Sequence, residues 1–247
     1  MHLAARPGVR QSVGAEAVYR SINEHGTACL LDACGSAGVR RIVFASSSSV
    51  YGAGAAGPFR EDVPLGDPAS PYAATKQAAE RLVRGYASAV GRRAAVVRLF
   101  SVYGPRQRPD LAVHAFTHRL VAGLPVSIYG DGSSRRDYTH AADVARGILA
   151  AVDWTGTGLA ACEAFNIGSG APVRLDLLVS ELARALGVEP RLDRHPAHPA
   201  DLSVTWADTA KARRELGFEA RVPIRQGIAD FVSWYEREHG RQSSPAA

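Results

Sequence analysis

The stretch Ser70-Pro-Tyr-Ala-Ala-Thr-Lys76 predicts the beginning of a helix that carries two chemically useful side chains. Proline fits the first helical turn, where its missing N–H would have had no partner, and the run that follows to Arg84 is rich in helix formers. Tyr72 and Lys76 are four residues apart and share one face of that helix. A tyrosine has a pKa of about 10, so a base that works near pH 7 needs a pKa about three units lower, which a neighbouring ammonium favours. The same spacing also occurs by chance on helix surfaces, so the pair alone is a weak signal.

A serine-rich segment precedes this helix, in the run Arg41-Ile-Val-Phe-Ala-Ser-Ser-Ser-Ser-Val-Tyr-Gly52. The apolar residues from Ile42 to Ala45 include β-branched and aromatic types, which is typical of a strand buried on both faces. The polar run from Ser46 to Ser49 begins where that strand should end. Because ligands of open parallel sheets bind beyond the carboxyl ends of the strands, these hydroxyls are candidates for a binding site. They could instead form an ordinary solvated loop.

Three further motifs follow in order: Val97-Arg-Leu-Phe-Ser-Val-Tyr-Gly-Pro-Arg-Gln107, Tyr129-Gly-Asp-Gly-Ser-Ser-Arg-Arg-Asp-Tyr138 and Phe165-Asn-Ile-Gly168. Together with the serine-rich segment and the tyrosine–lysine pair, they resemble the extended short-chain dehydrogenase/reductase family, which includes the NAD-dependent nucleotide-sugar epimerases and dehydratases. Within this family the likeness is greatest to the UDP-glucuronate and UDP-glucose 4-epimerases. The resemblance runs from His2 to about Tyr235, and five motifs in the right order make it specific.

The resemblance implies an α/β fold, an incomplete Rossmann-like doubly wound parallel sheet with a smaller C-terminal substrate-binding region. A truncated NAD-binding domain would comprise residues 1–107 and the returning segment 139–170. The substrate-binding domain would comprise residues 108–138 and 171–240, followed by a disordered tail at 241–247. Periodicity and breaker residues predict helices over 16–38, 71–90, 110–123, 143–152, 175–186, 209–216 and 224–235, and strands over 42–45, 94–99, 126–129 and 165–167.

The opening of the chain departs from the family pattern. His2-Leu-Ala-Ala5 looks like the end of the family's fourth strand, whereas the family begins with a strand, a glycine-rich turn and a helix that hold the dinucleotide pyrophosphate. No Gly-x-x-Gly-x-x-Gly follows a strand in this sequence. Two explanations stay open: the sequence as given is shortened, or it is a fragment that has lost tight NAD binding. If the sheet begins at Leu3, we expect exposed apolar edges, an uncovered face, and either lower stability or association that shields this surface.

The resemblance also assigns catalytic roles. Tyr72 would take the proton of the sugar O4 while hydride passes from C4 to the nicotinamide. Lys76 would hold the nicotinamide ribose and favour the phenolate, and Ser47 would bridge the substrate hydroxyl and the tyrosine oxygen by short hydrogen bonds. The residues expected to contact the cofactor NAD are Asn23, Ala45, Ser46, Tyr72 and Lys76.

The expected substrate-binding residues divide by the part of the substrate they contact. A C6 carboxylate could be bound by Ser48, Ser49, Ser101 and Arg108. The nucleotide diphosphate and ribose would be held by Arg136 and Asp201, an arginine being suited to bidentate phosphate contact, although both could be ordinary surface charges. No metal site is expected, because His140 and His195 have no metal partners at motif spacing.

The expected reaction is epimerisation at C4 of a nucleotide-diphosphate sugar. Dehydratases of the family carry Thr-Asp-Glu where this chain has Ser47-Ser48-Ser49, and serine cannot supply the acid and base that remove water. Phe100-Ser101 and Gly104-Pro-Arg-Gln-Arg-Pro-Asp110 match the glucuronate-specific members, so UDP-glucuronate is the first expected substrate and UDP-glucose/galactose the second. Two alternatives stay open: an inactive family member that binds a nucleotide sugar or a partner, and another nucleotide-sugar reductase or decarboxylase.

Composition indicates the compartment and the partners. With 46% hydrophobic and 21% charged residues the chain is an ordinary globular protein. The net charge of +5 is spread over scattered arginine pairs, so no nucleic-acid partner is expected. No apolar run approaches the roughly 18 residues that span a bilayer, and no signal sequence is evident, so we expect a cytoplasmic protein with no membrane partner. The three cysteines (Cys29, Cys34 and Cys162) are expected to be buried, and the resemblance implies a homodimer formed through helices 16–38 and 71–90.

Overall fold

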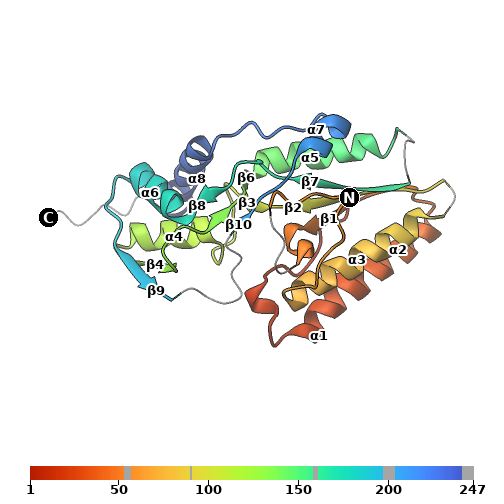
Figure 1. Ribbon diagram of the computed structural model, residues 1–247, viewed down its shortest axis with the longest axis horizontal. Helices are drawn as coiled ribbons and strands as arrows, with labels where there is room; N and C mark the ends of the chain where they lie inside the picture. Colours follow the sequence, from red (N-terminus) through yellow and green to blue (C-terminus); the bar gives the residue numbers. More distant parts are fainter. Residues whose placement is uncertain (53–56, 90, 158–160, 197–203, 241–247) are drawn as a thin grey trace.

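A computed structural model describes residues 1–52, 57–89, 91–157, 161–196 and 204–240 (Figure 1). The chain forms two neighbouring parts: a sheet with helices on both faces, and a C-terminal cluster of helices and short strands. The expected tail at 241–247 lies outside the described residues. Within the described part, no helix is long and apolar enough to cross a membrane.

The central sheet contains three parallel strands in the order β1-β2-β7: Arg41–Ser47, Arg93–Leu99 and Cys162–Ile167. Their middle residues are buried on both faces, as expected for a parallel sheet. Beside β1, His2 forms a single parallel bridge to Phe44, with hydrogen bonds from His2 N to Val43 O (2.8 Å) and from Ala45 N to His2 O (3.0 Å). The opening segment therefore pairs with β1, in the place expected for the end of a strand.

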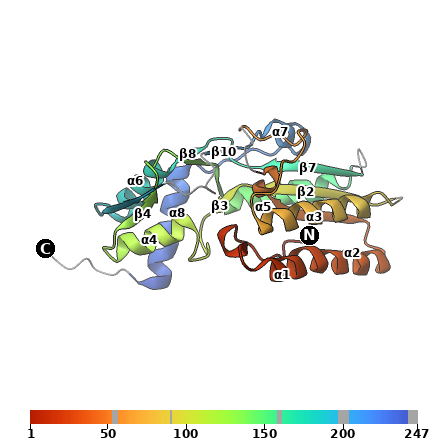
Figure 2. The same ribbon diagram turned by 60° about the horizontal axis from the view of Figure 1, so that its bottom comes forward.

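Helices cover both faces of this sheet (Figures 1 and 2). On one face α3 (Pro71–Ala87) packs against β1 and β2, with α2 (Gly26–Ser36) beside it. On the other face lie α5 (Ala141–Trp154) and α7 (Ala210–Leu216). The expectation of an uncovered face was therefore wrong for the described strands, because these helices bury it. The expectation of exposed apolar groups at the edge is met by Leu3, which is 53% exposed.

The predicted helix over 16–38 is one continuous helical segment with a change of winding. It comprises α1 (Glu16–Tyr19), the π-helical η2 (Arg20–His25) and α2. The start of α3 matches its sequence signals, because Pro71 occupies the first turn and the Ser70 hydroxyl accepts a hydrogen bond from Ala73 N at 3.1 Å. These local signals place Tyr72 in the first turn of α3.

The C-terminal cluster has its own hydrophobic core, formed by residues such as Leu178, Leu182 and Phe231. Its helices are α4 (Ala112–Val121), α6 (Leu175–Leu186) and α8 (Ile224–His239). Its strands form three small sheets: β4 (Val126–Tyr129) with β9 (Leu192–His195); β3 (Ser101–Tyr103) with β6 (Tyr138–His140); and β10 (Val204–Thr205), β5 (Arg135–Arg136) and β8 (Val173–Arg174). Two short 3₁₀ turns, η1 (Arg10–Ser12) and η3 (Ser48–Tyr51), complete the described elements.

The cysteines differ from their expected environment. Cys29 is exposed, with its Sγ 3.5 Å from His25 Nε2, while Cys34 and Cys162 are half-buried. The expectation that all three are buried was wrong, because Cys29 lies on the outer side of α2, away from the sheet.

Candidate active site

The serines at the end of β1 and the start of η3 lie in two different environments. The chain turns into η3 at Ser47, whose Oγ accepts hydrogen bonds from Ser49 N (3.2 Å) and Ser49 Oγ (3.0 Å). Ser46 points the other way, and its Oγ donates to Glu80 Oε1 of α3 at 2.5 Å. The Ser46 side chain is therefore part of the packing between β1 and α3. The expected contact of Ser46 with the cofactor remains a prediction, and it would have to be made by the Ser46 backbone.

Tyr72 lies beside Ser47, although the two are 25 residues apart. Burial raises the pKa of Tyr72, and a side-chain hydrogen bond with Ser47 and the positive charge of Arg108 partly offset this effect. The ring packs edge-on against Tyr19, with centroids 6.3 Å apart. Two of the predicted catalytic residues are thus in contact.

Lys76 is almost fully buried, with 4% of its surface exposed. Its Nζ donates to the carbonyl oxygen of Ala45 at 2.7 Å and lies 4.7 Å from the centre of the Phe44 ring. Burial lowers the pKa of Lys76 to about 8, against an opposing effect of Glu80. The ammonium is directed at the Ala45 carbonyl, and the expected effect of Lys76 on the Tyr72 phenolate remains a prediction.

Asn23 is buried and joins two segments of the N-terminal part. Its Oδ1 accepts from Arg6 N at 2.7 Å, and its Nδ2 donates to Arg6 O (3.0 Å) and to Thr75 Oγ1 (3.1 Å). Both amide hydrogens are therefore engaged within the protein. The geometry shows Asn23 holding the opening segment to α3, and its expected contact with the cofactor remains a prediction.

Two adjoining cavities collect the predicted substrate-binding residues. The first, of about 270 Å³, is lined by Ser47, Ser48, Ser49, Ser101 and Arg136. The second, of about 440 Å³, is lined by Arg108, Arg136, Tyr129 and Tyr138 among others. Arg10 lines both cavities and was missed in the sequence analysis, because nothing local in its loop marks it. Asp201 lies outside the described residues.

Arg108 is held by an acidic neighbour. Its Nε and Nη2 donate to the two carboxylate oxygens of Asp110 at 2.9 and 2.5 Å, and Asp110 Oδ2 also accepts from Gln11 Nε2 at 3.1 Å. The Arg108 guanidinium lowers the pKa of Asp110. A substrate carboxylate at Arg108 would therefore have to share or replace the Asp110 contact.

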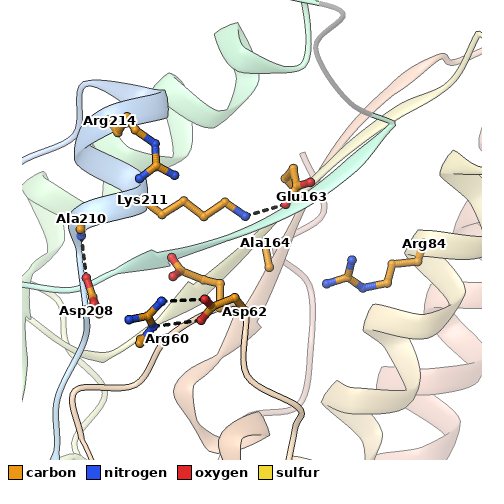
Figure 3. A pocket seen from close by; sticks show the side chains of 10 residues that line it. Arg60, Asp62, Arg84, Glu163, Ala164, Asp208, Ala210, Lys211 and Arg214 are labelled. Atoms are coloured by element: carbon orange, nitrogen blue, oxygen red, sulfur yellow. Dashed lines mark hydrogen bonds and ion pairs between the residues drawn. The ribbon is translucent and has the colours of Figure 1, made fainter.

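A third cavity, of about 400 Å³, lies at the outer edge of β7 (Figure 3). Its lysine and one of its arginines are paired: Lys211 with Glu163 at 2.5 Å, and Arg60 with Asp62 at 2.7 Å. Four basic residues (Arg60, Arg84, Lys211, Arg214) and four acidic ones (Glu61, Asp62, Glu163, Asp208) line it. This balance supplies no net positive charge for a diphosphate, so the serine-lined cavities are the better candidate for a nucleotide-sugar site.

The residues at the end of β1 fit the nicotinamide end of a dinucleotide. The Lys76 ammonium has three N–H groups and one protein acceptor, Ala45 O, which leaves donors for ribose hydroxyls. Tyr72 lies one turn away on α3. The 247 residues contain no glycine-rich turn for the pyrophosphate. The fit is therefore limited to the nicotinamide ribose.

Comparison with known proteins identifies the family. The profile of the NAD dependent epimerase/dehydratase family matches residues 1–168. A UDP-glucuronate 4-epimerase of Thermodesulfobacterium geofontis (strain OPF15) is 40% identical over 235 residues, which are 95% of this chain and 71% of that protein. The chain belongs to the NAD-dependent epimerase/dehydratase family.

Solved structures agree with this membership of the epimerase/dehydratase family. MoeE5 in complex with UDP-glucuronic acid and NAD is 41% identical with a TM-score of 0.87, over 96% of this chain and 78% of that one. The UDP-glucuronic acid 4-epimerase from Bacillus cereus, in complex with UDP-glucuronic acid and NAD, is 32% identical with a TM-score of 0.90, over 97% and 75%. The comparisons confirm the expected family and its Rossmann-like α/β fold.

Proposed function

We propose that this chain is an NAD-dependent nucleotide-sugar 4-epimerase that acts first on UDP-glucuronate and second on UDP-glucose/galactose. The observation that carries the proposal is the placement of Tyr72 beside Ser47, whose side chain lowers the pKa of the phenol, at the border of a cavity lined by Ser48, Ser49 and Arg136. The relatives that bind or act on UDP-glucuronate support the choice of substrate.

The lining of the first cavity favours epimerisation over dehydration. Ser47, Ser48, Ser49 and Ser101 supply hydroxyls, which can donate and accept hydrogen bonds, and no carboxylate is among its lining residues in the described part of the chain. Removal of water from a sugar needs an acid and a base on adjacent carbons, whereas epimerisation needs one base at O4. Arg136 and Arg108 supply positive charge for the diphosphate and a C6 carboxylate.

Tyr72 acts as the base in this proposal, with Ser47 as the link to the sugar hydroxyl. In the ligand-free protein Tyr72 is a phenol at neutral pH, because burial raises its pKa, while Lys76, with a pKa of about 8, is mostly an ammonium. The pKa of Tyr72 must fall when ligands bind, and the Ser47 hydrogen bond and the Arg108 charge already act in that direction. Bound NAD supplies the hydride acceptor and donor for C4.

The test combines binding and turnover on the purified chain. Calorimetry with added NAD should show binding, and incubation with NAD and UDP-glucuronate should give UDP-galacturonate without net NADH formation. Tyr72→Phe should lower kcat roughly 100- to 10,000-fold, because it removes the proton acceptor and leaves the ring packing in place. NAD binding without turnover would indicate an inactive family member, release of CO2 would indicate a decarboxylase, and full activity of Tyr72→Phe would rule out the mechanism.

A further inference from the structure

The first serine-lined cavity has two walls that come from different segments of the chain. One wall is the turn at residues 47–52, which contains η3, and the other is the end of the segment 66–70, which leads into α3. The two segments are in contact, because Gly66 N donates to Tyr51 O at 3.2 Å. Gly52 has a φ of +85°, and a Cβ there would lie 2.4 Å from a backbone oxygen of the second segment. A side chain at this position would therefore collide with the second wall.

One side chain of α3 binds both walls. Gln77 is 8% exposed, and its Nε2 donates to Val50 O at 2.8 Å and to Gly66 O at 2.9 Å. Both N–H bonds of the amide are therefore used, one on each wall. The preceding residue, Lys76, donates to the carbonyl oxygen of Ala45 on β1 at 2.7 Å. Consecutive residues of α3 thus hold the end of β1 and the two segments that border the cavity.

The serine turn is also held from its other side. Tyr51 Oη donates to Asn166 Oδ1 of β7 at 2.6 Å, and Asn166 Nδ2 donates to Phe59 O at 2.7 Å. These bonds fix the turn to the sheet. The bonds of Gln77 fix the same turn to α3, which is the helix that carries Tyr72.

We propose that Gln77 is a positioning residue that holds both walls of the first serine-lined cavity on α3, and so sets how tightly Ser48 and Ser49 bind a substrate. The two serines line this cavity from the turn that Gln77 holds. A glutamine suits this role because its amide nitrogen has two donors, which glutamate and methionine of similar length lack. The role in substrate binding deepens the proposed function and rests on it, whereas the contacts of Gln77 with the two walls do not.

Hydrogen exchange of the ligand-free chain tests these contacts directly. Gln77→Met keeps the length of the side chain and removes both donors. The amides of residues 48–52 should then exchange about 10- to 100-fold faster than in the wild type, because the carbonyl groups of both walls lose a partner, and Val50 is fully buried. The amides of β4, in the C-terminal cluster, should exchange as in the wild type.

Gln77→Glu adds a rescue that depends on pH. A carboxylate cannot donate a hydrogen bond, whereas a protonated carboxyl group donates one, so acid should restore one of the two bonds. Relative to the wild type at the same pH, exchange in residues 48–52 should slow by about 3- to 10-fold between pH 8 and pH 5 in Gln77→Glu and stay constant in Gln77→Met. Burial raises the pKa of the introduced carboxyl group and brings its titration towards this range.

Two comparisons control for other titrating groups. Gln226→Glu is the same substitution at an exposed position of α8, and it should leave the exchange of residues 48–52 unchanged at every pH. The titratable and charged groups on the segments around Gln77 are the same in the wild type and in both Gln77 variants: Lys76, Glu80 and Arg81 on α3, Tyr51 in the turn, Asp67 in the second wall, and Arg98 on β2.

Turnover separates positioning from a general loss of folded protein. Gln77→Met should raise KM for UDP-glucuronate roughly 10-fold and change kcat less than about 3-fold, because the turn contacts the substrate while Tyr72 keeps its place on α3. A smaller folded fraction would instead lower kcat and leave KM unchanged.

The proposal is overturned if residues 48–52 exchange in Gln77→Met as in the wild type, if β4 exchanges faster to the same extent, or if an active variant keeps its KM. Should Gln77→Met fail to fold, the absence of any slowing in Gln77→Glu between pH 8 and pH 5 would overturn it too. An inactive chain with the expected exchange rates would refute the epimerase and leave the positioning role of Gln77 intact. An active epimerase with unchanged exchange would refute the role of Gln77 alone.

Discussion

At the scale of single residues, the site combines a buried amine with a half-buried phenol. Burial penalises the charged form of each, which lowers the pKa of Lys76 and raises that of Tyr72. Both shifts oppose the charged pair that proton abstraction requires. At neutral pH the phenol is uncharged, so only the burial of the Lys76 ammonium lowers the stability of the fold.

Replacement of Lys76 by methionine tests this cost. The pKa of Lys76 is about 8 in the folded protein, against 10.5 for an unperturbed lysine, so the unfolded state binds more protons between these values and stability rises with pH across that window. Below pH 8 the full penalty applies, about 3 kcal/mol, less about 1 kcal/mol for the bond to Ala45 O. Lys76→Met should raise the free energy of unfolding at pH 7 by about 2 kcal/mol, with a gain that shrinks towards pH 10, as measured by urea denaturation. Lys211→Met is the control, and a gain independent of pH would contradict the interpretation.

Arg108 tests the choice of substrate. Arg108→Met should reduce kcat/KM for UDP-glucuronate roughly 10- to 100-fold, because a charged hydrogen bond contributes about 1.5–3 kcal/mol, and should affect UDP-glucose much less. Arg174 is a matched control, because it forms the same bidentate contact with Asp176 (3.0 and 2.6 Å) and does not line either serine-side cavity. Equal losses of kcat/KM for the two substrates would show that Arg108 does not bind the C6 carboxylate.

At the scale of elements, α3 positions the chemistry through its first turn. Ser70 caps the helix, Pro71 occupies the first position, and Tyr72 N donates to Ser12 Oγ at 3.1 Å. These bonds satisfy backbone groups that a helix N-terminus leaves without partners. The orientation of the tyrosine depends on this turn more than on the rest of the helix.

Ser70→Ala should therefore lower the free energy of unfolding by about 1 kcal/mol, because the Ala73 N–H loses its acceptor. It should also lower kcat by loosening Tyr72. Ser88→Ala at the other end of α3 removes an exposed hydroxyl that donates to Gly85 O at 2.6 Å, and it should change stability by less than half as much. Chemical denaturation measures the free energy of unfolding of both variants. Equal losses of stability in Ser70→Ala and Ser88→Ala would exclude a special role of the N-terminal turn.

At the scale of the whole molecule, one carboxylate joins segments far apart in sequence. Asp137 is fully buried between β5 and β6, and it accepts bonds from Ser169 N (2.7 Å), Gly170 N (3.0 Å) and Ala207 N (3.1 Å). Its neighbour Arg136 lines both serine-lined cavities. The loop after β7 and the segment before α7 are thereby held beside these cavities.

Asp137→Asn should lower the free energy of unfolding by about 2–4 kcal/mol, because an amide nitrogen cannot accept and leaves buried donors without partners. It should also raise KM by displacing Arg136. Asp208→Asn is a matched control: Asp208 Oδ1 accepts a hydrogen bond from Ala210 N at 2.9 Å just before α7, and an asparagine Oδ1 can accept the same bond. Similar stability for both variants in urea titrations would refute this role of Asp137.

The residues whose signals are local could be predicted from the sequence. The β1 strand, the start of α3 at Pro71 and the bounds of β4 and α6 follow from residue types within one or two turns of each position. The strands β9 and β10 were missed. The four residues of β9 are mostly polar and exposed, and β10 has only two residues, so neither carries an apolar pattern and both form strands only through pairing with distant segments. The Rossmann-like fold and the family were also accessible, because their motifs are contiguous.

The sequence by itself determined which chemical groups are present: a tyrosine and a lysine on one helix face, serines after a buried strand, and arginines in two later motifs. Only the tertiary structure decided where those groups point. It directs Lys76 to the Ala45 carbonyl, turns Ser46 towards Glu80, and brings Arg10 to the lining of the two serine-lined cavities. The physical reason is that a buried polar group takes whichever partner the packing places within hydrogen-bond distance, and that partner here comes from segments about 30 or more residues away.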